Sequence, residues 1–326
     1  MAQSEGGAEQ RRALQNQDVL QTEPGEIAKR TRSDGSGRRA RKSGHGIKLI
    51  ARSRLLELLT QCNVNWAEAR TRRAGARRIP TPMIEVANLT KTYETFVAVR
   101  GLSFTVKEGE ILGLVGPNGA GKTSTLRALA GIHPPTDGQI RICGHDIQQD
   151  AVEAKRRLAF FPDEPRLFDY LTVEEHMQFV GTLYGVPNFR ERVGPLLEEL
   201  QLSDKRKSMP TELSRGMKQK LMIACGFLHD PEVLIFDEPL TGLDPLGIRR
   251  MKESITRRAQ AGASVILSSH LLHLVEELCD TVAIIQNGAR IAYGTIDDLK
   301  WQIAQGRGDV SLEEAFLKIT EETAAR

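Results

Sequence analysis

The clearest chemistry in this sequence lies in one glycine-rich stretch of eight residues, Gly116, Pro117, Asn118, Gly119, Ala120, Gly121, Lys122 and Thr123. Their order fits the pattern G-x-x-x-x-G-K-[ST], a loop that binds phosphate groups. Its glycines let successive backbone N–H groups point inward at phosphate oxygens. Lys122 can then reach the β- and γ-phosphates of a nucleotide, and the Thr123 hydroxyl can ligate Mg²⁺. The stretch therefore predicts nucleotide binding and leaves the use of the nucleotide open.

The segments on either side of this loop suit the same task. The apolar run over 111–115 predicts a short buried strand that leads into the loop. Residues 124–130 predict a helix that leaves the loop at Ser124, and the positive end of its dipole faces the same phosphates. A chance match in a glycine-rich turn is the alternative, and it leaves these flanking patterns unexplained.

Two neighbouring carboxylates, Asp237 and Glu238, follow a second apolar run over 233–236. Such a run predicts a buried parallel strand, and its carboxyl end is where open α/β sheets bind ligands. Asp237 suits Mg²⁺, which prefers oxygen ligands, and Glu238 suits polarising the water that attacks a γ-phosphate. The alternative, a solvated acidic turn, loses weight because the phosphate loop already requires a carboxylate for Mg²⁺.

A third segment, Leu213-Ser214-Arg215-Gly216-Met217, lies between these two. Ser214 predicts the N-cap of a helix that continues to Phe227 and stops before Pro231. Taken alone, this is an ordinary amphipathic helix with a serine cap.

Together, these segments resemble the ATPase cassette of ABC transporters from about Met83 to the C-terminus. The resemblance implies an α/β fold, a P-loop NTPase core of ABC ATPase type with a helical subdomain inserted between phosphate loop and signature motif. It implies ATP and Mg²⁺ as cofactors. Residues 213–217 resemble the family signature L-S-G-G-Q, with Arg and Met at the third and fifth positions. In the family two cassettes pair head to tail, so Ser214 and Gly216 would cap the γ-phosphate held by the partner cassette.

Further positions match the family in order. The triplet 242–244 resembles the D-loop, with Asp244 at its end, and links the two sites of the dimer. His270 follows the predicted strand over 264–267 and resembles the switch histidine that contacts the γ-phosphate. Tyr93 resembles the aromatic residue that stacks on adenine, since its ring offers a flat apolar face. The alternative interpretation is that Tyr93 belongs to a β-strand and packs its ring in the core.

One position departs from the family. Asp163 stands where the family has Gln, within Phe160-Phe161-Pro162-Asp163-Glu164-Pro165. A carboxylate can still ligate Mg²⁺ or a water molecule, but it adds negative charge beside the γ-phosphate. We expect retained ATPase activity with altered metal dependence. The family uses this segment to touch its membrane partner, so 162–169 is the predicted coupling surface, with a rigid surface loop as the alternative.

Composition bounds the class of protein. The chain has 326 residues, of which 40% are hydrophobic, and no apolar stretch approaches the roughly 18 residues that span a bilayer. A transport pore must then be another polypeptide. The four cysteines, Cys62, Cys143, Cys225 and Cys279, form no C-x-x-C pair and fit a reducing cytoplasm.

Positive charge is concentrated in residues 1–82, which hold seventeen Lys and Arg against eight Asp and Glu, whereas the net charge of the whole chain is only +3. This basic N-terminal extension is predicted to be disordered, with one short amphipathic helix over 47–66. Membrane-surface or nucleic-acid binding are two possible uses. A solvated tail, or a native chain that starts at Met83, is the simpler interpretation.

The cassette is predicted over 83–294, with a helical insert at about 162–225 and a short helical tail over 295–326. Capping-box patterns at Thr172–Glu175 and Ser311–Glu314 predict two helix starts. The chain contains no internal repeat and therefore holds one cassette, so two hydrolysis sites require a homo- or heterodimer.

The predicted function is an ATP-binding and hydrolysing subunit that drives a separate membrane permease, for export, from the cytoplasmic face of the inner membrane as a peripheral protein. The alternative is a non-transport ABC ATPase that acts on nucleic acid or ribosomes through the basic extension, although we do not expect a nucleic-acid partner. A P-loop kinase or GTPase would explain neither residues 213–217 nor His270, and the chain lacks N-K-x-D.

Overall fold

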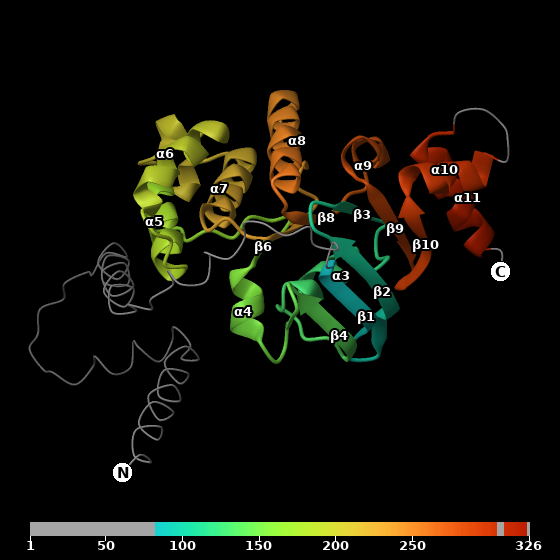
Figure 1. Ribbon diagram of the computed structural model, residues 1–326. Coiled ribbons are helices and arrows are strands. Elements are labelled where there is room, and N and C mark those ends of the chain that lie inside the picture. Colours follow the sequence, from blue (N-terminus) through green and yellow to red (C-terminus); the bar gives the residue numbers. More distant parts are fainter. Residues whose placement is uncertain (1–81, 305–309, 325–326) are drawn as a thin grey trace, which may run out of the picture. The chain divides into compact units, whose positions relative to one another are not determined.

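The structure is a computed structural model, and it describes residues 82–304 and 310–324 (Figure 1). The basic N-terminal extension and the helix predicted over 47–66 lie outside the described residues.

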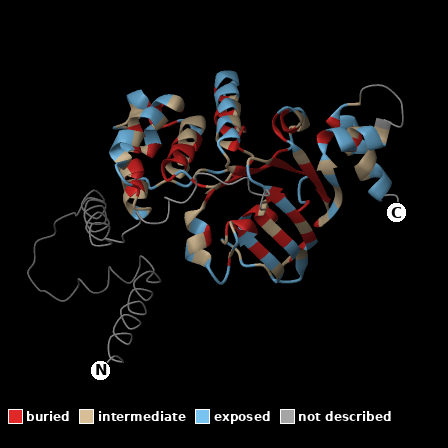
Figure 2. Cartoon of the chain, in the orientation of Figure 1, coloured by how far each residue is buried: buried red, intermediate tan, exposed pale blue. Residues whose placement is uncertain are grey.

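The apolar runs form the centre of a six-stranded sheet in the order β10-β9-β3-β8-β7-β6. Its strands are β3 (Ile111–Val115), β6 (Leu158–Phe161), β7 (Val233–Asp237), β8 (Ser264–Ser268), β9 (Thr281–Gln286) and β10 (Ala289–Thr295). All neighbours are parallel except β9 and β10, which form an antiparallel hairpin. Every residue of β3, β7 and β8 is buried, as expected of strands covered on both faces (Figure 2). The strands predicted from three apolar runs are confirmed.

A second, antiparallel sheet has the order β2-β1-β4-β5. It comprises β1 (Pro82–Tyr93), β2 (Phe96–Lys107), β4 (Asp137–Ile142) and β5 (His145–Asp146). Strands β1 and β2 each run for 12 residues because register shifts let their pairing continue past irregular positions. Gly138 of β4 is required at the register shift between β4 and β1, because a Cβ there would lie 2.4 Å from the Asn88 carbonyl oxygen.

Most of the described helices connect strands, and two follow the last strand. The helices are α3 (Lys122–Leu129), α4 (Ala151–Arg156), α5 (Val173–Leu183), α6 (Phe189–Glu199), α7 (Arg215–Leu228), α8 (Pro245–Gln260), α9 (Leu272–Leu278), α10 (Ile296–Ala304) and α11 (Leu312–Ala324), with 3₁₀ turns at Ser203–Lys205 and Pro210–Glu212. Helices α5, α6 and α7 form a helical block between β6 and β7 (Figure 1). No described helix is long and apolar enough to cross a membrane.

The helix starts predicted from capping patterns are confirmed. Thr172 and Glu175 cap α5 reciprocally, and Ser311 and Glu314 do the same for α11. Ser214 caps α7 by accepting a hydrogen bond from the Met217 backbone N–H at 3.3 Å. These local side-chain contacts fix where each helix begins.

Helix α7 packs against the sheet through a small aromatic cluster. The Phe161 ring at the end of β6 stacks on Phe236 of β7, with 4.5 Å between centroids, and contacts Phe227 edge to face. Gly226 allows the close approach, since a Cβ there would lie 2.2 Å from the Phe161 ring. The helical block is thereby held against the two strands whose ends carry Asp163 and Asp237.

Candidate active site

The phosphate loop connects β3 to α3 in the predicted manner. Gly119 and Gly121 have positive φ values of 80° and 104°, which L side chains rarely adopt. A Cβ on Gly121 would also lie 2.4 Å from the Ala98 carbonyl oxygen of β2. The Gly288 backbone N–H, at the turn of the β9–β10 hairpin, donates to the Ala120 carbonyl at 3.0 Å. The loop is therefore held from both sides by distant segments.

Lys122 lies folded into this loop. Its Nζ donates to the carbonyl oxygens of Gly116 at 2.6 Å and Pro117 at 3.2 Å, and the residue is only 8% exposed. Burial lowers the pKa of this amine, while the nearby charges of Glu238 and Asp237 oppose that shift. The ammonium is thus prepared to exchange carbonyl contacts for phosphate oxygens.

Oxygen ligands suited to a hard cation converge beside Lys122. The Thr123 hydroxyl lies 3.3 Å from Asp237 Oδ1, and the Ser268 hydroxyl donates to the same oxygen at 2.7 Å. Asp237 is 4% exposed, so its carboxylate is fixed by packing as well as by hydrogen bonds. A hydroxyl next to an oriented carboxylate fits the octahedral, partly hydrated coordination of Mg²⁺.

Glu238 lies next to this oxygen pair in a strained conformation. Its φ is +52°, unusual for a residue other than glycine, and its backbone N–H lies 3.1 Å from the Ser268 hydroxyl and 3.2 Å from the Ser268 carbonyl. The His270 ring donates from Nδ1 to Glu238 Oε2 at 2.9 Å. The glutamate is therefore oriented by Ser268 at the end of β8 and by His270, two residues further along the chain, as a general base must be.

A cavity of about 310 Å³ lies at the phosphate loop, Asp237 and Glu238, and His270 is not among the residues that line it. It is lined by Phe96, Ala98, Asn118, Gly119, Ala120, Gly121, Lys122, Thr123, Ser124, Asp237 and Glu238. The cavity joins backbone N–H groups, an ammonium and a carboxylate pair, which fits a nucleotide triphosphate with its metal ion. When bound, Mg²⁺ would supply charge neutralisation at the phosphates, and Thr123 and Asp237 are the residues placed to hold it.

Phe96 and Ala98 line the cavity, although the sequence analysis did not predict them as site residues. Phe96 is 62% exposed at the start of β2, although its ring is large and apolar. Tyr93, the predicted base-stacking residue, does not line the cavity; it packs edge-on against His133 at 5.8 Å, with Lys91 Nζ 5.0 Å from its ring centroid. The alternation of β2 places Phe96 and Ala98 on one face of the strand, and that was the available signal.

Other predicted residues lie outside this cavity. Asp163 is bound to Arg215, with its Oδ1 3.1 Å from Nη2. Ser214 and Asp244 are exposed and Gly216 is half-buried. None of the four lines the cavity of its own chain. The predicted role of Ser214, Gly216 and Asp244 is at the nucleotide of a second chain, and that role does not require them to line the cavity of their own chain.

Comparisons with known proteins agree with this geometry. The family model for ABC transporters matches residues 99–241. The ABC-type transporter ATP-binding protein EcsA of Bacillus subtilis is 36% identical over 244 residues, which cover 74% of this chain and 98% of EcsA. The Nod factor export ATP-binding protein I of Ralstonia nicotianae is 38% identical over 67% of this chain and 69% of its own.

A solved structure of an ATP-binding subunit of an ABC transporter is 37% identical, with a TM-score of 0.70, and covers 73% of this chain and 99% of the solved one. Fold, motif order and similarity over nearly the full length of EcsA and of the solved subunit all indicate one family. The chain belongs to the ATP-binding subunits of ABC transporters and is an ATPase.

Proposed function

We propose that this subunit powers export through a separate membrane permease, as one of two cassettes that close on ATP. The observation that carries the proposal is the division of the site: one set of residues lines the cavity, while Ser214, Gly216 and Asp244 lie elsewhere on the surface. A second cassette would bring those residues to the γ-phosphate, and α7 would contribute its N-terminal dipole there. Within each cavity, Lys122 would bind the phosphates, Thr123 and Asp237 would hold Mg²⁺, and Glu238 with His270 would activate water.

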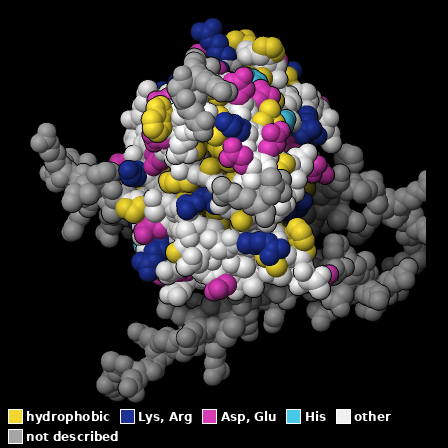
Figure 3. Space-filling model, turned by 90° about the vertical axis from the view of Figure 1, so that its right-hand side faces the viewer, with side chains coloured by type: hydrophobic (Ala, Val, Ile, Leu, Met, Phe, Trp, Pro, Cys, Tyr) yellow, Lys and Arg dark blue, Asp and Glu magenta, His cyan; other side chains and the backbone are white. Residues whose placement is uncertain are grey.

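The direction of transport rests on the relatives. Two of them are named for Nod factor export and linearmycin resistance, the latter being 36% identical over 70% of its length. These relatives are named as ATP-binding proteins of transport, export or resistance systems, so they do not favour the alternative, an ATPase that acts on nucleic acid. In keeping with this, the described residues on the face in Figure 3 intersperse Lys and Arg with Asp and Glu and form no continuous basic patch there.

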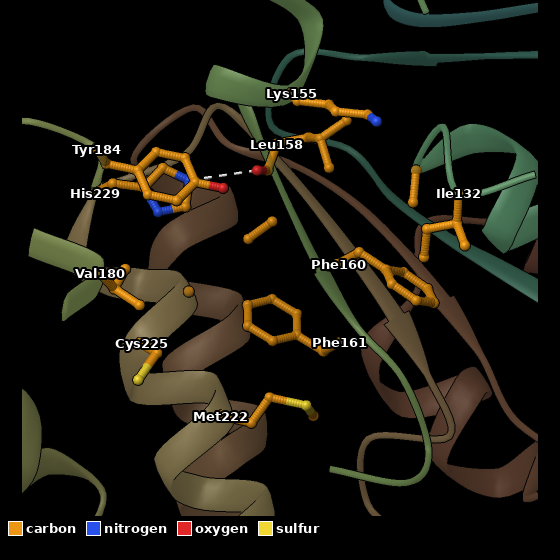
Figure 4. Close-up of a pocket in the computed structure, with 13 residues that line it drawn as sticks. Ile132, Lys155, Leu158, Phe160, Phe161, Val180, Tyr184, Met222, Cys225 and His229 are labelled. Atoms are coloured by element: carbon orange, nitrogen blue, oxygen red, sulfur yellow. Dashed lines mark hydrogen bonds between the residues drawn. The ribbon is translucent and has the colours of Figure 1, made fainter. Parts of the chain in front are cut away.

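A hollow beside the predicted coupling segment supports a permease contact. It has a volume of about 350 Å³ and is lined by Ala130, Ile132, Lys155, Leu158, Ala159, Phe160, Phe161, Val180, Tyr184, Met222, Cys225, Gly226 and His229. Figure 4 shows Ile132 and Phe160 on one side, with Val180, Cys225 and Met222 opposite. The side chains that line the hollow are mainly apolar, and Lys155 adds a positive charge. We infer that it receives a short permease helix with an apolar side chain and an acidic neighbour.

The coupling segment itself is attached to α5 by one histidine. His176 is 4% exposed; its Nε2 accepts a hydrogen bond from the Phe168 N–H at 3.0 Å, and its Nδ1 lies 2.8 Å from the Thr172 carbonyl oxygen. Because Nε2 accepts, the ring must be neutral with its proton on Nδ1. Burial lowers the pKa of His176, while the Thr172 carbonyl and Glu175 raise it less.

The stability of the chain should therefore fall in mild acid. As the pH drops below about 6.5, the unfolded chain takes up a proton at His176 before the folded chain does. Protonation stabilises the unfolded state, so the free energy of unfolding falls by up to about 1.4 kcal/mol per pH unit. Urea unfolding at pH 7.5 and pH 5.5 should show this loss, and it should be smaller in His176→Gln, whose side chain cannot titrate. An equal pH dependence in both proteins would contradict the role given to His176.

Replacing Ile132 with Glu should separate the subunit from its permease. Ile132 is 51% exposed at the hollow, and a buried carboxylate there would oppose docking of an apolar helix. We expect loss of the permease from the tagged chain recovered from gently solubilised membranes, while the ATPase rate of the purified chain stays within about twofold. Val152→Glu is the matched control, since Val152 is 63% exposed on α4 and outside the hollow.

The wild-type chain in the same experiment tests the whole proposal. A polytopic membrane protein recovered in stoichiometric amount, and identified by mass spectrometry, is the expected result. Recovery of the chain alone, or with ribosomes or nucleic acid, would remove the basis for an export function. Retention of the permease by Ile132→Glu would reject only the location of its docking surface.

A further inference from the structure

Asp163 and Arg215 form an ion pair between two segments that are 52 residues apart. The distance from Nη2 to Oδ1 is 3.1 Å, and the side chains are 57% and 43% exposed for Arg215 and Asp163. Asp163 lies two residues beyond the end of β6, and Arg215 is the first residue of α7. The pair therefore connects the coupling segment to the start of the signature helix.

Arg215 stands at a position that is unfavourable for a cation. The first turn of a helix carries the positive end of its dipole, and α7 has no acidic residue there to compensate. The guanidinium instead turns to Asp163. Its stem also lies along the turn after β7: a Cβ on Gly242 would be 3.7 Å from Arg215 Cδ. Arg215 is thus in contact with both loops that leave the carboxyl ends of β6 and β7.

Strand register places Asp163 at the same edge of the sheet as the nucleotide cavity. Phe161 of β6 is paired with Phe236 of β7, so Asp163 and Glu238 both lie two residues beyond that pair. Neighbouring strands are about 4.8 Å apart. The carboxyl edge of these strands consequently carries Asp163 together with Asp237 and Glu238, and the latter two line the cavity that would receive a triphosphate. Uncompensated, the Asp163 carboxylate would repel that anion.

We propose that Arg215 is a positioning residue for nucleotide binding, which holds and neutralises Asp163 so that this third carboxylate does not oppose the triphosphate. The pair acts on its own chain's nucleotide, through charge rather than through direct contact. It extends the assigned ATPase activity and does not depend on export or on the identity of the permease.

The test is a double-mutant cycle of ATP binding to the full chain. Calorimetric titration with ATP in EDTA, at low ionic strength, measures binding without hydrolysis. Arg215→Gln should raise the dissociation constant about threefold, because Asp163 is left uncompensated. Asp163→Asn should lower it, because Arg215 is left without its carboxylate. The double variant should return to within about twofold of the wild type.

Salt and a control pair distinguish this role from a structural one. In about 1 M salt the four dissociation constants should converge, since exposed charges are screened. Arg249 and Glu253 form a comparable pair on α8, with 3.0 Å between Nε and Oε1, and their Gln variants should not reproduce the pattern. Two results would overturn the proposal: weaker ATP binding in both single variants, as expected if the pair only holds the two segments together, or a double variant that binds ATP as weakly as Arg215→Gln. Unchanged melting temperatures of the free variants exclude misfolding as a cause.

Discussion

Glu238→Gln is expected to slow ATP hydrolysis by at least about 100-fold while ATP binding persists, because general-base catalysis commonly contributes that much. The substitution keeps the shape of the side chain and its place beside His270 Nδ1, which lies 2.9 Å from Oε2 in the wild type. Only the basic oxygen is lost. With hydrolysis blocked, ATP should hold two chains together.

Two measurements check this result. Phosphate release gives the rate, and size-exclusion chromatography with and without ATP gives the fraction of dimer. Glu253→Gln is the control, because Glu253 lies exposed on α8, where it pairs with Arg249. Hydrolysis at the wild-type rate in Glu238→Gln would show that another group activates the water.

Lys122→Ala should act earlier in the reaction, by weakening ATP binding itself by about 10- to 100-fold. Hydrogen bonds to a charged group are worth roughly 1.5–3 kcal/mol, and tenfold corresponds to about 1.4 kcal/mol. The ammonium is buried against Gly116 and Pro117 and has only a short distance to move to reach phosphate oxygens.

The appropriate readout is equilibrium binding of ATP, with Lys107→Ala as the comparison. Lys107 is an exposed lysine at the end of β2. Full ATP affinity in Lys122→Ala would contradict the interpretation of the loop. A variant that melts at a much lower temperature than the wild type would instead point to the loss of its contacts with the loop carbonyls.

The sequence alone predicts the parts of this protein that depend on neighbouring residues. The phosphate loop, the strand that ends in Asp237 and Glu238, and the caps at Ser214 and Thr172 are local patterns, and each is present where predicted. Their order along the chain was sufficient to identify the family. The fold followed because parallel strands and their connections follow few topologies.

The parts that the sequence did not predict depend on residues far apart in the chain. Nothing local to Asp163 indicates that Arg215 will pair with it, and nothing local to Phe96 indicates that it will line the cavity. The length of β1 and β2 likewise depends on irregular pairing between them. Such features require the register of two segments, which periodicity within one segment does not contain.

The hairpin between β9 and β10 has a thermodynamic consequence for ligand capture. Its Asn287-Gly288 turn has positive φ at both positions, which is typical of a tight two-residue hairpin. Through Gly288 it donates to Ala120 in the phosphate loop and accepts from the Arg100 N–H of β2 at 2.7 Å. The loop is therefore ordered before ATP arrives. Little conformational entropy is lost when ATP enters, so more of the free energy gained at the phosphates remains available to draw two cassettes together.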